Sequence, residues 1–182
     1  LRANSGGYLD QAIKILNEFF SNGELLVYTE GHAREIEKYR ANFLGLYKTG
    51  GLTILIDEGS ASASEIIAGA IQDHERGIII GQKSFGKGLV QEQIPLPDGS
   101  LIRLTVARYY TPLGRCIQKP YSYDEDIYGG ANSQQNPDID TLQHFFTKSG
   151  KTVYGGGGIT PDEIISLSNE ILPASLLYLY NS

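Results

Sequence analysis

Ser62 heads a segment whose residue types suit acyl transfer. It lies where an apolar run of strand length, residues 52–57, gives way to a helix rich in small residues. The unpaired backbone N–H groups and the helix dipole at such a junction favour developing negative charge. A serine hydroxyl there can attack a carbonyl group, and the N–H of Ala63 can bind the oxyanion. The same position suits an N-cap serine, and the spacing alone favours that structural role.

A serine nucleophile needs a base, and Lys87 is the candidate. The histidines, His32, His74 and His144, have no motif context, so a Ser-His-Asp triad is poorly supported. A lysine serves instead where burial lowers its pKa, and Lys87 lies among glycines and apolar residues. If a strand begins there, Gln91 shares its face and can hold the amine without adding a charge. The alternative is an exposed surface lysine.

Two further motifs overlap in residues 81–87, and neither fits its usual context. The pattern G-x-x-x-x-G-K is typical of a phosphate loop, but Gly88 stands where Ser or Thr is needed, and strand-like alternation follows. The pattern S-x-x-K pairs Ser84 with Lys87 only on a helix, which Gly86 and Gly88 disfavour. We therefore expect neither phosphate binding nor a Ser84 nucleophile.

The elements that position these residues follow from hydrophobic periodicity and turn signals. The run 52–57 is typical of a central strand buried on both faces. Strand, helix and strand in this order indicate a parallel sheet with a right-handed crossover. Residues 33–48 fit either a helix or strands. The other predicted elements are a helix over 8–20, a strand over 24–30, a helix reaching about His74, a strand over 77–81, and a hairpin of 89–96 with 100–110.

Composition limits the classes of function. The chain has 182 residues, 15 Lys and Arg against 21 Asp and Glu, and 41% hydrophobic residues, as in a globular domain with a sizeable core. Its net charge of −6 and lack of a basic stripe exclude a typical nucleic-acid binder. No apolar run is long enough to span a membrane. The single cysteine, Cys116, excludes an internal disulfide framework and a Cys-rich zinc site.

Residues 120–150 are polar and turn-rich, and we expect a long surface insertion or loop. The segment is acidic, but the spacing of its acids matches no EF-hand, so a solvated loop is favoured over a calcium site. The acids are Asp124, Glu125, Asp126, Asp138 and Asp140. Residues 166–182 are expected to be a tail, helical in part and interrupted at Pro173.

Several blocks of the sequence follow one another in a recognisable order. They are Leu1-Arg2-Ala3-Asn4-Ser5-Gly6-Gly7, Gly59-Ser60-Ala61-Ser62-Ala63-Ser64-Glu65-Ile66, Ser84-Phe85-Gly86-Lys87-Gly88, Asp98-Gly99-Ser100, Arg108-Tyr109-Tyr110-Thr111-Pro112 with Gly114-Arg115, and Gly158-Ile159-Thr160-Pro161-Asp162. Together these blocks resemble the carboxy-terminal processing peptidases, the tail-specific proteases of peptidase family S41. The resemblance covers about residues 1–165, apart from 120–150, and predicts a peptidase core there.

The resemblance implies an α/β fold with a ClpP/crotonase-like layered core, a mostly parallel sheet and a β-hairpin extension. A PDZ domain normally precedes the first block, and we expect this chain to be a core truncated at its N-terminus, without that domain. Family habit implies export to the periplasm or another extracytoplasmic compartment. Whether copies of the chain form a homo-oligomer stays open.

The resemblance also implies roles for individual residues. The middle serine of the S-A-S-A-S run is the family's nucleophile, which is Ser62 here, and the lysine of F-G-K-G is its general base, Lys87. The glutamine four positions further on, Gln91, supports that lysine. The oxyanion donors would be the backbone N–H of Ala63 and of a glycine in the first block, with Gly6 preferred over its neighbour Gly7.

The expected activity is therefore hydrolysis of unfolded or extended polypeptides, near apolar C-termini, through an acyl-enzyme. The substrate would bind by β-addition beside the sheet, and neither a metal nor an organic cofactor is needed. Two alternatives remain from the residues: a non-catalytic peptide-binding domain on the same fold, and a serine hydrolase of small esters or amides. Joint retention of Ser62, Lys87 and Gln91 argues against the binding domain.

Overall fold

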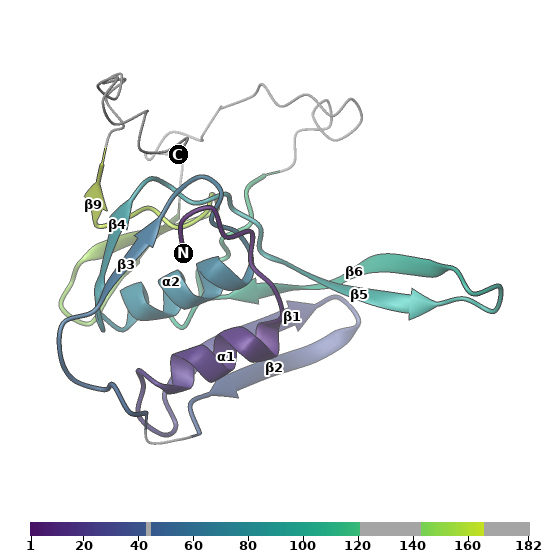
Figure 1. Cartoon of the computed structure of the whole chain (residues 1–182), viewed down its shortest axis with the longest axis horizontal. Coiled ribbons are helices and arrows are strands. Elements are labelled where there is room, and N and C mark those ends of the chain that lie inside the picture. The colour runs from purple at the N-terminus through teal and green to yellow at the C-terminus, as the bar shows by residue number, and fades with distance from the viewer. Residues whose placement is uncertain (43–44, 121–142, 166–182) are drawn as a thin grey trace, which may run out of the picture.

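A computed structural model describes residues 1–42, 45–120 and 143–165 of the chain and shows a mixed α/β fold (Figure 1). Two helices lie between a four-stranded and a three-stranded sheet, and strands β5 and β6 project from the body as a long hairpin. The elements are α1 (Leu9–Asn17), β1 (Leu25–Gly31), β2 (Arg34–Arg40), β3 (Thr53–Ile56), α2 (Ala63–Asp73), β4 (Ile78–Gly81), β5 (Leu89–Pro95), β6 (Leu101–Tyr110), β7 (Gln143–Phe146), β8 (Thr152–Gly155) and β9 (Glu163–Ile164).

The largest sheet is antiparallel, in the order β2-β1-β6-β5. The prediction of a mostly parallel sheet is therefore wrong. Two tight connections decide the direction, because strands joined by a short turn must run antiparallel. One joins β1 to β2, which settles residues 34–40 of the ambiguous 33–48 segment as strand, and the other is the predicted turn between β5 and β6. The ClpP/crotonase-like layering stays a prediction.

The smaller sheet is parallel, in the order β3-β4-β9, and confirms the predicted strand–helix–strand unit. Its register pairs Thr53 with Ile78 and continues in step along both strands. The prediction that 52–57 is a central strand buried on both faces is wrong, since β3 lies at the edge of this sheet and Leu55 is 46% exposed. An apolar run indicates a preference for burial but does not specify which neighbours provide it.

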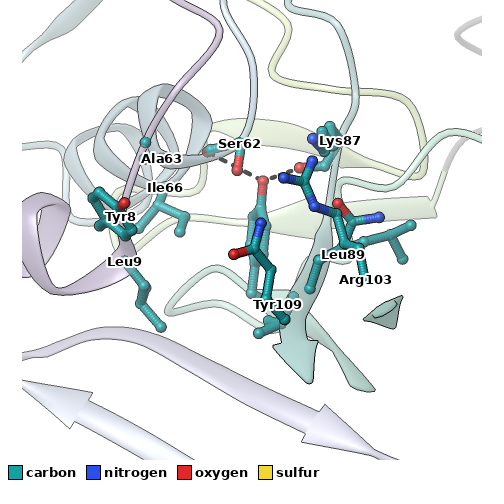
Figure 2. A pocket seen from close by; sticks show the side chains of 13 residues that line it. Tyr8, Leu9, Ser62, Ala63, Ile66, Lys87, Leu89, Arg103 and Tyr109 are labelled. Carbon is teal, nitrogen blue, oxygen red and sulfur yellow. Dashed lines mark hydrogen bonds between the residues drawn. The ribbon is translucent and has the colours of Figure 1, made fainter. Parts of the chain in front are cut away.

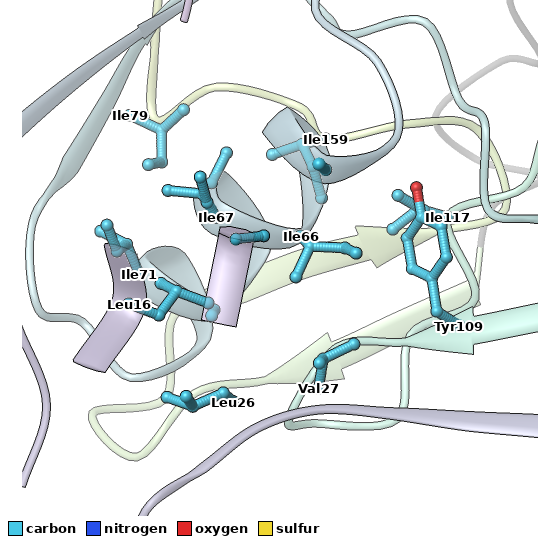
Figure 3. Packing of buried hydrophobic residues seen from close by; sticks show 14 of the residues in the cluster. Leu16, Leu26, Val27, Ile66, Ile67, Ile71, Ile79, Tyr109, Ile117 and Ile159 are labelled. Atoms are coloured by element: carbon cyan, nitrogen blue, oxygen red, sulfur yellow. The ribbon is translucent and has the colours of Figure 1, made fainter. Parts of the chain in front are cut away.

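The core lies between the two sheets, around α2 (Figure 3). Every residue of α2 is buried, including its polar ones, so the helix is enclosed on all sides. Leu16 of α1, Leu26 of β1 and Ile79 of β4 pack around it with Ile71. Each such aliphatic side chain contributes about 1.5–3 kcal/mol when it is fully buried. The residue at the N-cap of α2 is therefore attached to a fully buried helix.

Part of the 120–150 segment is more regular than expected. Residues 143–146 form β7, which pairs with β8 in an antiparallel hairpin. The acids of this segment between 124 and 140 lie outside the described residues, and so does the predicted tail 166–182. Neither α1 nor α2, the helices of the described ranges, has the length and apolar character needed to cross a membrane.

Candidate active site

Ser62 occupies the N-cap position of α2 in a strained conformation. Its backbone angles are φ 54° and ψ −115°, a region that non-glycine residues rarely adopt. Such a conformation costs about 1–3 kcal/mol and persists only where surrounding contacts impose it. Ser62 thus stands at the N-cap position that the spacing favoured, with a backbone strain that an ordinary cap does not need.

The two neighbouring serines of the S-A-S-A-S run hold the first residues of the chain beside this turn. The hydroxyl of Ser60 donates to the carbonyl of Leu1 at 2.8 Å. The hydroxyl of Ser64 and the N–H of Ala61 both donate to the carbonyl of Asn4, each at 3.0 Å. Alternate serines of one motif therefore do different work: Ser60 and Ser64 anchor residues 1–7, and Ser62 faces a pocket.

Asp57 provides a second anchor for residues 1–7, and sequence analysis missed it. Its carboxylate accepts hydrogen bonds from the backbone N–H of Ala3 at 2.9 and 3.0 Å and of Gly59 at 3.0 Å. Burial raises the pKa of Asp57, but these bonds, the hydroxyl of Ser60 and the charge of Arg2 together hold it below its ordinary value. The carboxylate that ends β3 thus fixes the glycine-containing N-terminal segment.

Gly6 packs directly against the Ser62 turn. Its φ is +99°, and a Cβ at this position would lie 2.6 Å from the carbonyl oxygen of Ala61 and 2.7 Å from the nitrogen of Ala63. Only glycine fits so close an approach at this φ. The N–H of Gly6 donates to Oδ1 of Asn4 at 2.9 Å in this structure, whereas Gly7 lines the pocket.

A single open pocket of about 290 Å³ brings together four of the five site residues expected from the sequence (Figure 2). Ser62 and Ala63 come from the start of α2, Lys87 from the loop before β5, and Gln91 from β5 itself. Gly6, the fifth, lies behind the Ser62 turn rather than in the pocket lining. Within the described ranges, no three His, Cys, Asp or Glu side chains are placed to hold a metal ion.

Glu65 links the start of α2 to the Lys87 loop. Its side chain is fully buried, and Oε2 accepts the backbone N–H of Ser62 at 2.8 Å and of Lys87 at 2.9 Å. Oε1 accepts the N–H of Gly86 at 2.7 Å and the hydroxyl of Ser84 at 2.5 Å. Burial raises the pKa of Glu65, and the four hydrogen bonds offset only part of that rise. A Glu at the third helix position after an N-cap Ser is a capping-box signal that predicts the first of these bonds.

Tyr109 of β6 holds the same two residues through their carbonyl groups. Its hydroxyl lies 3.1 Å from the carbonyl oxygen of Ser62 and also contacts the carbonyl oxygen of Lys87 (Figure 2). Tyr109 is 2% exposed, and burial raises the pKa of its phenol well above the ordinary value. No local sequence pattern pointed to this role.

The competing motifs in 81–87 have structural roles. Ser84 is buried, donates to Glu65 and accepts the N–H of Ile159 at 2.7 Å, so its hydroxyl is engaged on both sides. The strand β5, not a helix, follows the G-x-x-x-x-G-K segment. The arrangement lacks the helix N-terminus that a phosphate loop requires.

Comparisons with known proteins identify the family of this chain. The model of peptidase family S41 matches residues 1–128. The chain is 48% identical over 118 residues to a carboxy-terminal-processing protease of Bartonella bacilliformis, covering 65% of this chain and 27% of that protein. It is 43% identical over 120 residues to a carboxyl-terminal-processing protease of Picosynechococcus sp., covering 65% of this chain and 28% of the relative.

Solved structures show the same relationship. The photosystem II D1 C-terminal processing protease superposes with a TM-score of 0.64 and 29% identity, covering 97% of this chain and 35% of that one. The chain spans roughly a quarter of the length of the two curated relatives, 27% and 28%. With most of its length matched by the family model, the chain belongs to peptidase family S41.

Proposed function

We propose that this chain carries the catalytic centre of a serine endopeptidase that works through a Ser62–Lys87 dyad and an acyl-enzyme. The observation that supports it is the meeting of Ser62, Lys87, Gln91 and Ala63 around one pocket. Ser62 and Ala63 come from one segment and Lys87 and Gln91 from another that is distant along the chain, so their convergence is a property of the fold. Membership of a serine peptidase family agrees with this assignment.

The chemistry follows from the residues that line the pocket. The neutral amine of Lys87 takes the proton of the Ser62 hydroxyl as Oγ attacks the carbonyl carbon of the scissile peptide. The tetrahedral intermediate collapses, the C–N bond breaks, and Lys87 returns the proton to the leaving amine. A water molecule then attacks the ester, giving its proton to Lys87, and the carboxylic acid leaves as Ser62 recovers its hydrogen. We propose that Gln91, which lines the same pocket, holds the amine of Lys87 without adding charge.

The oxyanion forms beside the N-terminus of α2. The backbone N–H of Ala63 points from the first helical position, and no hydrogen-bond partner within the described residues occupies it. We propose it as one donor. The second donor comes from Gly6 or Gly7: Gly6 must release Oδ1 of Asn4 to serve, whereas Gly7 already lines the pocket.

The substrate that fits this site is an extended polypeptide. Among the described residues, strand β5 forms the outer edge of the antiparallel sheet, and its outer side pairs with no strand there. Lys87 lies two residues before β5 begins, so a peptide added along this edge passes the dyad. The names of the relatives indicate carboxy-terminal processing, and we extend that to unfolded chains with apolar C-termini. Extracytoplasmic location and assembly into a homo-oligomer remain predictions.

The test is cleavage of a reduced, carboxymethylated protein by the unmodified chain and by Ser62→Ala and Lys87→Ala. Both variants should lose at least ~10³-fold in kcat/KM. Ser100→Ala and Lys38→Ala, at exposed positions, should match the unmodified chain. Cleavage that persists in Ser62→Ala, or a chain that hydrolyses small esters but no polypeptide, would contradict the proposal.

A further inference from the structure

We infer that Glu65 and Tyr109 are positioning residues that together form a clamp on the backbones of Ser62 and Lys87. Glu65 holds their N–H groups, and Tyr109 holds their carbonyl groups. One carboxylate oxygen binds the N–H groups of both residues, and one phenol hydroxyl contacts the carbonyl groups of both. The inference rests on the proposed function, because it assigns a catalytic purpose to the separation of these two residues.

In the carboxylate half of the clamp, every hydrogen bond to the Glu65 side chain runs from a donor to a carboxylate oxygen. Ser62, Lys87, Gly86 and Ser84 all point an N–H or O–H at Glu65. An ionised carboxylate has the acceptor sites for all of these donors. A glutamine keeps the shape but turns one acceptor into an NH₂ group, which would face donors in a fully buried site. Glu65→Gln is therefore a change in hydrogen-bond polarity rather than in packing.

The hydroxyl half comes from a different layer of the fold. Tyr109 belongs to β6, and its backbone N–H donates to the carbonyl of Gly88 at 3.0 Å. The same residue therefore holds the base loop by its backbone and both members of the dyad by its side chain. Tyr109→Phe removes one oxygen and keeps the buried ring, which lets the hydroxyl be tested without opening a cavity.

The clamp matters because Ser62 and Lys87 lie in separate segments of the chain, the turn before α2 and the loop before β5. Ser62 is held in a strained turn and Lys87 in an irregular loop, and each gains its place from tertiary contacts. A displacement of about 1 Å between reacting groups can cost ~10²-fold in rate. Glu65 does not line the pocket, so its effect must pass through Ser62 and Lys87 rather than through substrate.

The experiment compares kcat, KM and the melting temperature of Glu65→Gln, Glu65→Asp and Tyr109→Phe. Glu75→Gln, at the other end of the same helix region, and Tyr28→Phe, in the same sheet, are the matched controls. Tyr109→Phe and Glu65→Gln should each lower kcat about 10²-fold, with KM within about threefold. Glu65→Asp should recover part of kcat because it keeps an ionised acceptor. The two controls should retain kcat.

Two results would overturn the clamp. The first is a folded Tyr109→Phe and a folded Glu65→Gln that both keep kcat within about threefold of the unmodified chain. The second is a loss of kcat that only follows the loss of folded protein, with Glu65→Asp no better than Glu65→Gln. Ser62→Ala and Lys87→Ala run beside them: if these stay active, the proposed function itself fails and the clamp falls with it. If they are inactive while the clamp variants are active, only the clamp is wrong.

Discussion

Ser62 and Lys87 donate their backbone N–H groups to the same atom, Oε2 of Glu65, at 2.8 and 2.9 Å. One residue begins a fully buried helix and the other ends the loop that leads into the edge strand β5. The shared acceptor means that neither backbone can shift without disturbing the bond to the other. Their separation is thus held by buried side chains, Glu65 together with Tyr109, rather than by the long stretch of chain between them.

Acidification should inactivate the protein in part through Glu65. Burial holds the pKa of this carboxyl above its ordinary value, and protonation places a hydrogen among four donors. Tyr109, whose pKa is raised, stays neutral on the acid side. We expect kcat to rise with pH. In Glu65→Gln, the part of that rise that is due to ionisation of the Glu65 carboxyl should disappear. A flat profile between about pH 6 and about pH 9 would contradict a lysine base.

Stability should respond to the same carboxyl in the opposite direction. The folded-state pKa of Glu65 is raised above the unfolded value, so the folded protein binds this proton more tightly. Its contribution to the unfolding free energy is therefore fully present below the unfolded pKa and lost as pH rises through the folded pKa. Urea unfolding at several pH values should show that Glu65→Gln removes this slope. A slope that is unchanged in Glu65→Gln would mean that other groups produce it.

Gly6→Ala should damage the site through sterics alone. The added Cβ would lie 2.8 Å from Cβ of Ser62 and closer still to two backbone atoms, at a φ of +99°. We expect kcat/KM to fall at least ~10²-fold because the Ser62 turn must move. The backbone strain should also lower the unfolding free energy by about 1–3 kcal/mol. Gly51→Ala, where an added Cβ meets nothing within 4 Å, is the control; equal activity of the two variants would refute the close approach.

The buried ion pair between Asp73 and Arg115 should stabilise the far end of α2. Their side chains are 0% exposed, and Nη2 lies 2.5 Å from Oδ1. Burial lowers the pKa of Arg115, while the charge of Asp73 raises it. Arg115→Met should cost about 3–5 kcal/mol in unfolding free energy because it leaves a buried charge unpaired.

The double variant Asp73→Leu with Arg115→Met should recover part of that loss, since it removes both charges together. Urea unfolding curves with equal slopes would allow the midpoints to be compared directly. A double variant that is less stable than Arg115→Met alone would show that Asp73 stabilises the fold even without Arg115, for example through its hydrogen bond with the N–H of Leu113. That outcome would contradict the expectation that the unpaired charge of Asp73 is the main cause of the instability of Arg115→Met.

Local pattern predicted the elements around the site better than their arrangement. The small-residue helix, the hairpin and the strand–helix–strand unit each have a signal in a few neighbouring residues, and each is present. Strand direction in the large sheet and the edge position of β3 depend on which segments meet in space. Leu55 carries the same apolar signal whether a further strand covers it or not.

The candidate site shows the same division. Ser62, Lys87, Gln91 and Ala63 belong to motifs of the family, so the resemblance indicated them before any contact was known. Tyr109 and Asp57 act through partners that are distant in sequence, such as the carbonyl of Ser62 and the N–H of Ala3. Tyr109 lies on a strand of alternating polar and apolar residues, and Asp57 follows an apolar run. The neighbouring residues in the sequence do not indicate either role.

The most direct test of the central claim is covalent labelling of the unmodified chain with a fluorophosphonate, followed by peptide mapping. An activated serine reacts with this probe, and the account predicts one adduct, on Ser62. Lys87→Ala should lower the labelling rate at least ~10³-fold, and Ser100→Ala should leave it unchanged. An adduct on another serine, no adduct at all, or a Lys87→Ala variant that is labelled at the unmodified rate would contradict a Ser62–Lys87 dyad.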